Sequence, residues 1–94
     1  MKVKFEYERT AKKISWFQFR EELKSFCDFM LTESYHGPVM DKVDKLYKDR
    51  FFVALIHKWH ELDMKANAAE SGSFWEDSYM QDRDHIAWIL VDLL

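Results

Sequence analysis

The chain opens with a short stretch in which charged and apolar residues alternate. In residues 2–8 the apolar side chains are Val3, Phe5 and Tyr7, and charged side chains occupy the positions between them. A period of two places the apolar side chains on one face of a β-strand. We therefore predict a strand over residues 2–8.

A single strand leaves its backbone N–H and C=O groups without partners, so it must pair with another strand. We expect it to pair with a second copy of the chain, which predicts a homodimer through the N-terminal strand. A target protein is a second candidate partner. The third is a hairpin within the chain, between residues 2–8 and 13–19, although residues 9–12 lack the Asn-Gly or Asp-Gly sequence that favours a tight turn.

Three segments with helical periodicity follow the strand. The first is predicted to begin at Ser15, because Ser15 and Gln18 have the spacing of a capping box and Ile14 and Phe19 that of a hydrophobic staple. Glu22 is predicted to face outward. The inward stripe, at intervals of three and four residues, contains Trp16, Phe19, Leu23, Phe26, Cys27 and Met30.

Gly37 and Pro38 are predicted to separate this first helix, over about residues 15–34, from a second helix over about residues 38–66. Glycine favours the left-handed conformation of a helix end, and proline cannot continue the helical hydrogen bonds. Between residues 51 and 62 the second helix is apolar over most of its circumference. We predict that it is central in the fold or covered by a partner, with a buried face that contains Phe52, Leu55, Ile56, Trp59 and Leu62.

A third helix is predicted over about residues 74–94, after a linker that ends at Ser73. Ser73 and Glu76 have capping-box spacing. The predicted fold class is therefore α+β, predominantly α, with one N-terminal strand and three helices in a single domain of residues 1–94. The inward stripe of the third helix contains Trp75, Tyr79, Ile86, Ile89, Leu90 and Leu93.

The chain has more aromatic residues than its interior accommodates. Of its 94 residues 17% are aromatic, and a domain of this size buries only about 60% of its unfolded surface. Exposed aromatic residues are typical of protein-binding surfaces. We therefore expect protein binding, and the alternative is that a monomer core takes them all. The aromatic residues off the predicted inward stripes are Phe17, Phe29, Tyr35, Tyr47, Phe51, Phe74 and Trp88.

Acidic residues are concentrated in the second half of the chain. Residues 1–50 contain 11 basic and 9 acidic side chains, whereas residues 51–94 contain 3 basic and 8 acidic ones. The net charge of −3 argues against direct nucleic-acid binding, because nucleic-acid binders carry a basic face. The acidic half predicts a basic partner.

Cys27 is the single cysteine, which excludes a disulfide within the chain. Its place in an apolar stripe indicates a structural thiol of a reducing compartment. The N-terminus shows no signal-peptide pattern, and no uncharged run approaches the roughly 20 residues of a membrane span. We expect a cytoplasmic protein with no membrane segment and no cofactor.

Histidine and acidic residues at helical spacing suggest one enzymatic alternative. His57, His60 and Glu61 share the second predicted helix, and Asp82 and His85 share the third. Residues three or four apart lie on one helix face, and these residue types bind zinc. The alternative function is a metal-dependent hydrolase with its site between the two helices. Such pairs are common by chance and no glycine-rich phosphate loop accompanies them, so we predict that the protein is not an enzyme.

The predicted function is that of a small acidic protein-interaction module, such as an inhibitor, antitoxin or adaptor of the kind that phages and mobile elements encode. The phage-like assignment rests on size and composition alone. We place the binding surface at the start of the last helix, where aromatic anchors meet acidic residues. The predicted binding residues are Phe74, Trp75, Asp77, Tyr79, Asp82 and Asp84.

Overall fold

The computed structural model describes residues 13–94, and all regular secondary structure in this range is helical. The α+β class is therefore wrong, because residues 13–94 contain five helices and no strand. The predicted strand over residues 2–8, with the dimer contact assigned to it, lies outside the described residues. The hairpin alternative is also wrong, since residues 16–19 form the first turn of a helix. The helices are α2 (Trp16–Met30), α3 (Glu33–Asp41), α4 (Val43–Lys48), α5 (Arg50–Ala68) and α6 (Phe74–Leu93).

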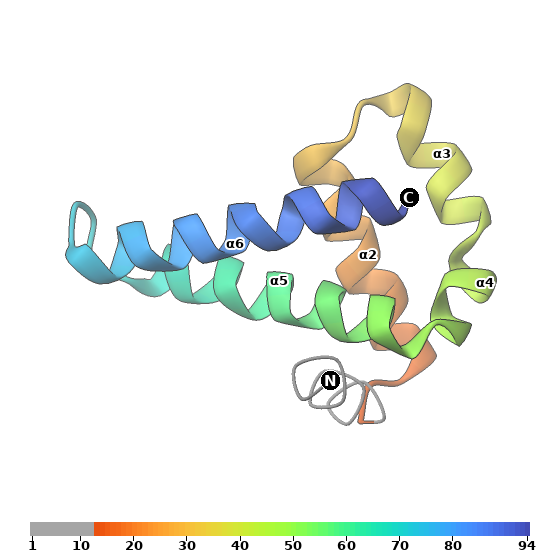
Figure 1. Ribbon diagram of the computed structural model, residues 1–94, viewed down its shortest axis with the longest axis horizontal. Coiled ribbons are helices and arrows are strands. Elements are labelled where there is room, and N and C mark those ends of the chain that lie inside the picture. The colour runs from red at the N-terminus through yellow and green to blue at the C-terminus, as the bar shows by residue number, and fades with distance from the viewer. Residues whose placement is uncertain (1–12) are drawn as a thin grey trace.

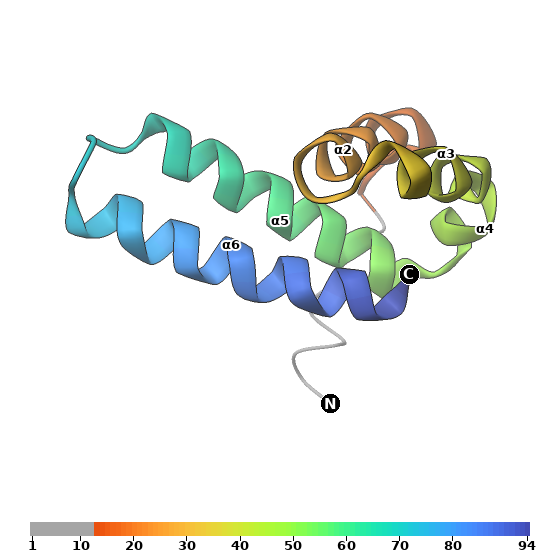
Figure 2. The ribbon, with the colours of Figure 1, turned by 90° about the horizontal axis from the view of Figure 1, so that it is seen from above.

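The two longest helices, α5 and α6, form an antiparallel hairpin (Figure 1). The three other helices gather at one end of this hairpin, where α2 and α4 pack against α5 and α3 packs against α2 and α4. Figure 2 shows that the loop between α5 and α6 lies at the opposite end, away from these three helices. None of the helices in residues 13–94 combines the length and hydrophobicity needed to cross a membrane.

The prediction that residues 51–62 are central in the fold is confirmed. Five consecutive residues of α5, from Phe52 to Ile56, are at most 2% exposed, and Trp59 is 1% exposed. Aromatic side chains of α2 meet this surface edge-on, Phe26 against Trp59 and Phe19 against Phe52, with ring centroids 5.2 and 6.1 Å apart. The edge-to-face arrangement places the positive ring edge on the negative ring face.

The helix predicted over residues 38–66 is wrong, because this range contains parts of three helices. Gly37 and Pro38 lie inside α3, which begins after Thr32. Pro38 is the sixth residue of this nine-residue helix, and its missing N–H removes one helical hydrogen bond, the one to the carbonyl of Ser34. The helix α4 ends before Asp49. The side chain of Asp49 accepts hydrogen bonds from the N–H groups of Phe51 and Phe52 at 3.1 and 3.2 Å, and this N-cap starts α5.

The start of α2 is as predicted, but the capping box is incomplete. The Ser15 hydroxyl accepts a hydrogen bond from the N–H of Gln18 at 3.1 Å. The Gln18 side chain donates to Glu22 at 3.1 Å, where a complete box would need it to return to the N–H of Ser15. The helix ends at Met30, four residues before the predicted end at residue 34.

The start of α6 is also as predicted, with the Ser73 hydroxyl accepting from the N–H of Glu76 at 3.2 Å. The Glu76 carboxylate accepts from the N–H of Gly72 at 3.0 Å. Gly72 has a φ of +79°, a left-handed conformation that glycine adopts without steric cost. The cap therefore fixes the turn that reverses the chain from α5 into α6.

We expect Ile56→Ala to lower the free energy of unfolding by about 2–5 kcal/mol, because Ile56 is 0% exposed and its removal leaves a cavity against packed neighbours. Urea denaturation followed by circular dichroism measures this loss. Met64→Ala on the same helix is the control, since Met64 is 59% exposed and its replacement should change stability by less than about 0.5 kcal/mol. A loss below ~1 kcal/mol for Ile56→Ala would contradict the central position of α5.

Candidate interaction surface at the hairpin tip

We call the end of α5, the loop and the first half of α6, residues 65–84, the hairpin tip. Two adjacent aromatic side chains at its start are largely exposed, Phe74 at 76% and Trp75 at 61%. Their rings pack edge-on against each other with centroids 5.6 Å apart, and the Trp75 ring stacks on that of Tyr79 at 6.1 Å. The Nζ of Lys65 lies 5.8 Å from the centroid of the Tyr79 ring. The tip therefore carries a connected row of three aromatic rings with a cation beside its last member.

The exposure of Trp75 corrects the predicted inward stripe of the last helix. Trp75 and Leu93 were both assigned to that stripe, yet they are 61% and 47% exposed. The buried positions of α6 include Arg83 and Ala87. The reason is that α6 packs against α5, and within residues 13–94 no third helix lies over α6 near the tip (Figure 2).

Of the seven aromatic residues that lie off the predicted stripes, Tyr47 and Phe51 are partly buried against the core, whereas the other five are at least half exposed. Their exposed fractions are 67% for Phe17, 50% for Phe29, 65% for Tyr35, 76% for Phe74 and 66% for Trp88. The alternative that a monomer core takes all the aromatic residues is therefore wrong for these five.

The acidic residues of the predicted site are exposed but divide between two flanks of α6. Helical spacing places Trp75, Tyr79 and Asp82 on one flank, at positions i, i+4 and i+7, and Asp77 and Asp84 on another. The side chains of Asp77 and Asp82 form no ion pair or hydrogen bond within residues 13–94. Asp84 accepts a hydrogen bond from the Nε of a neighbouring arginine at 3.3 Å. The six predicted residues thus do not form one ring, because Asp77 and Asp84 lie on roughly the opposite side of the helix from Trp75 and Asp82.

A hollow of about 360 Å³ lies between α5 and α6 beside the aromatic row. Asp82 and His85 of α6 line it together with Lys58 and Lys65 of α5. These two lysines were missing from the sequence-based site. They place positive charge on the flank of Asp82, so the acidic character of the tip is strongest on the flank of Asp77.

The five residues proposed as metal ligands do not converge. Only Asp82 and His85 line the same hollow, and their counterparts there are lysines. His57 points to α2, and His60 has a buried Nδ1 without a hydrogen-bond partner in the described part of the chain. Glu61 lies 3.8 Å from His57 Nε2. No group of three or more His, Cys, Asp or Glu residues within residues 13–94 is arranged to hold a metal ion.

His57 instead forms a buried polar pair with Glu22, which joins α5 to α2. The Nδ1 of His57 lies 3.0 and 3.2 Å from the two carboxylate oxygens of Glu22, whose residue is only 3% exposed. The prediction that Glu22 faces outward is wrong. The available signal was its spacing of four from Gln18, which donates to the same carboxylate and helps to satisfy it inside the protein.

Arg83 is a second buried charge that the sequence reasoning missed. It is 7% exposed, and its Nη1 lies 2.9 Å from an oxygen of Asp63 on α5. Its guanidinium carbon lies 4.7 Å from the ring centroid of Phe29 on α2. Arg83 follows Tyr79 by four residues and precedes Ile86 by three, so helical spacing did place it on the inward face.

Cys27 is buried in the core, as its apolar stripe predicted. Burial, and to a lesser extent the neighbouring Asp28 carboxylate, raise the pKa of its thiol to about 11. The thiol therefore stays protonated at neutral pH, which makes it a poor nucleophile.

No protein-family model matches this sequence, and no curated protein or solved structure matches it either. The functional argument consequently rests on the residues of the site alone.

We expect Glu22→Ala to lower the free energy of unfolding by roughly 2–4 kcal/mol, because it leaves His57 without its buried carboxylate partner. Glu21→Ala is the matched control, since the side chain of Glu21 is 49% exposed and its loss should cost less than about 0.5 kcal/mol. Urea denaturation of Glu22→Ala, His57→Ala and the double variant measures the coupling. If the two single losses add, Glu22 and His57 do not stabilise each other and the expected pairing is contradicted.

Proposed function

We propose that the protein is an interaction module that binds a basic protein partner through the hairpin tip. The observation that carries the proposal is the exposure of Phe74 and Trp75, two adjacent large aromatic side chains at the end of the molecule farthest from α3 and α4. Their side chains pack on each other and on Tyr79.

Exposed aromatic side chains of this kind favour association. Burying one large apolar side chain is worth roughly 1.5–3 kcal/mol, so two adjacent rings offer a partner a substantial part of a binding free energy. The Phe74 and Trp75 rings pack edge-on and Trp75 stacks on Tyr79 in the free protein, and a surface ordered before binding loses less side-chain entropy on association. The aromatic row therefore has the properties of an interface hot spot.

The charge of the tip supports a basic partner. Residues 65–84 contain five acidic and two basic side chains, and one of the two basic residues, Arg83, is buried and paired with Asp63. Unpaired carboxylates such as those of Asp77 and Asp82 attract a positively charged surface and steer its approach. Lys58 and Lys65 limit this field on the flank of Tyr79 and Asp82, so the flank of Asp77 is the more acidic of the two.

The protein would act by binding alone, as an inhibitor, antitoxin or adaptor of the kind that phages and mobile elements encode. Self-association through residues 2–8 and a cytoplasmic location are parts of the same proposal. The location is supported by the single, buried and protonated thiol of Cys27. The metal-dependent hydrolase has no comparable support, because its five residues do not come together.

Replacing the two exposed rings should abolish partner binding without unfolding the protein. We expect Phe74→Ala/Trp75→Ala to lose the partner that the wild type captures from a lysate of the source organism, as quantified by mass spectrometry. The affinity for the identified partner should fall about 30-fold or more, the effect of losing a hot spot. Trp88→Ala is the matched control, because Trp88 is 66% exposed on α6 outside the tip. Equal capture by the double variant and the wild type would contradict the proposal.

Neutralising the acidic residues should act on the rate of association. We expect Asp77→Asn/Asp82→Asn/Asp84→Asn to slow the association with the captured partner and to flatten its salt dependence, while the dissociation rate changes little. Surface plasmon resonance at several salt concentrations measures both rates, and circular dichroism checks that the helices are intact. An unchanged association rate, or an acidic partner, would show that these carboxylates belong to an ordinary solvated face.

A further inference from the structure

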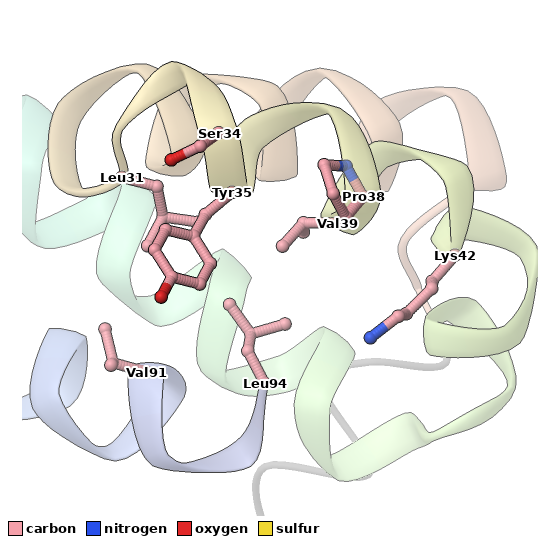
Figure 3. A pocket seen from close by; sticks show the side chains of 8 residues that line it. All are labelled: Leu31, Ser34, Tyr35, Pro38, Val39, Lys42, Val91 and Leu94. Atoms are coloured by element: carbon pink, nitrogen blue, oxygen red, sulfur yellow. The ribbon is translucent and has the colours of Figure 1, made fainter.

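A groove of about 550 Å³ lies at the other end of α6, between α3 and the C-terminal turn of α6. Figure 3 shows Leu31, Tyr35 and Val39 on one side of it and Val91 and Leu94 on the other. The groove is open because α3 packs against α2 and α4 whereas α6 packs against α5. Its volume lies within the range of about 300–1,000 Å³ that is usual for small-molecule sites.

Lys42 has the one charged side chain among the residues that line this groove. Its side chain extends from the junction of α3 and α4 toward Leu94 (Figure 3). Within residues 13–94 the ammonium group forms no ion pair or hydrogen bond. The groove therefore combines an apolar body with one unpaired cation at its edge.

We propose that this groove binds a medium-chain fatty acid, with the hydrocarbon tail between α3 and α6 and the carboxylate beside Lys42. The ligand must be apolar along its length, because the walls are aliphatic and aromatic apart from Lys42 and the hydroxyls of Ser34 and Tyr35. Charge complementarity favours an anionic group at one end, because Lys42 attracts a carboxylate and repels a cation. The site is independent of the hairpin tip, from which it is separated by the length of α6.

A peptide fits the groove less well than an acyl chain does. An extended peptide carries an N–H and a C=O at each residue, and the helical walls offer no strand edge to pair with them. Buried peptide groups without partners cost free energy. A helical peptide satisfies its own backbone, but a helix is about 10 Å across and needs an open trough for several of its side chains. An acyl chain has neither requirement.

The test is isothermal titration of the full chain with decanoate below its micelle concentration. We expect saturable binding at one site per chain, and weaker binding of decyltrimethylammonium, which has the same tail and the opposite charge. Lys42→Ala should weaken decanoate binding about two- to fivefold, the effect of an exposed ion pair. Lys45→Ala on the neighbouring helix is the control and should bind decanoate as the wild type does.

A second variant fills the groove. Leu31→Trp should abolish decanoate binding while circular dichroism and the unfolding midpoint stay near those of the wild type, because Leu31 is only partly buried. The proposal is overturned if decanoate binding does not saturate, if decanoate and decyltrimethylammonium bind equally, or if both variants bind decanoate like the wild type.

It is also overturned if Leu31→Trp converts a dimer to a monomer in light scattering without any decanoate binding, since the occupant is then a second copy. A shift of the amide signals of residues 1–12 in Leu31→Trp, again without decanoate binding, identifies the chain's own N-terminal segment as the occupant.

Discussion

The fold depends on the need to cover α5 on all sides. Consecutive helical residues are about 100° apart, so the five buried residues from Phe52 to Ile56 face every direction around the helix axis. No single neighbour can bury such a helix. The hairpin with α6 covers one side, and α2 and α4 cover the others. Because these shorter helices reach only part of α5 (Figure 2), the distal end of the hairpin has two layers where the rest of the molecule has three.

The sequence was sufficient to predict the features that depend on local chemistry. The central position of α5 follows from its apolar residues, and the starts of α2 and α6 follow from Ser15 and Ser73, whose hydroxyls satisfy free N–H groups of the first turn. The division of residues 38–66 was not predicted. Proline and aspartate are each compatible with a helix start, and their preferences differ by energies that tertiary packing easily exceeds. Aspartate is a preferred N-cap residue, so Asp49 did indicate a helix start. The predicted helix start was placed at Pro38 instead, which lies inside α3.

In the candidate sites, too, features set by neighbouring residues could be predicted, whereas contacts between residues far apart in the sequence could not. The exposure of Phe74 and Trp88 could be predicted because they lie off the inward stripe. The pairing of Glu22 with His57 could not, because it joins residues 35 positions apart and depends on how α2 crosses α5. The lysines in the hollow beside Tyr79 were missed for the same reason, since they come from the facing helix. The sequence thus predicted the helix that carries the six proposed binding residues, but not the lysines of α5 that face one flank of it.

The exposure of Trp75 follows from the rotation of α6 about its own axis, and Arg83 helps to fix that rotation. Trp75 and Arg83 are eight residues apart, which places them about 80° apart around the helix. A rotation that buries Trp75 against α5 would move Arg83 out of its pocket. It would break the 2.9 Å contact with Asp63 and the stacking on Phe29. The observed rotation keeps both contacts, and the side chain left at the surface is that of Trp75. Arg83 therefore favours the rotation that leaves the aromatic row exposed.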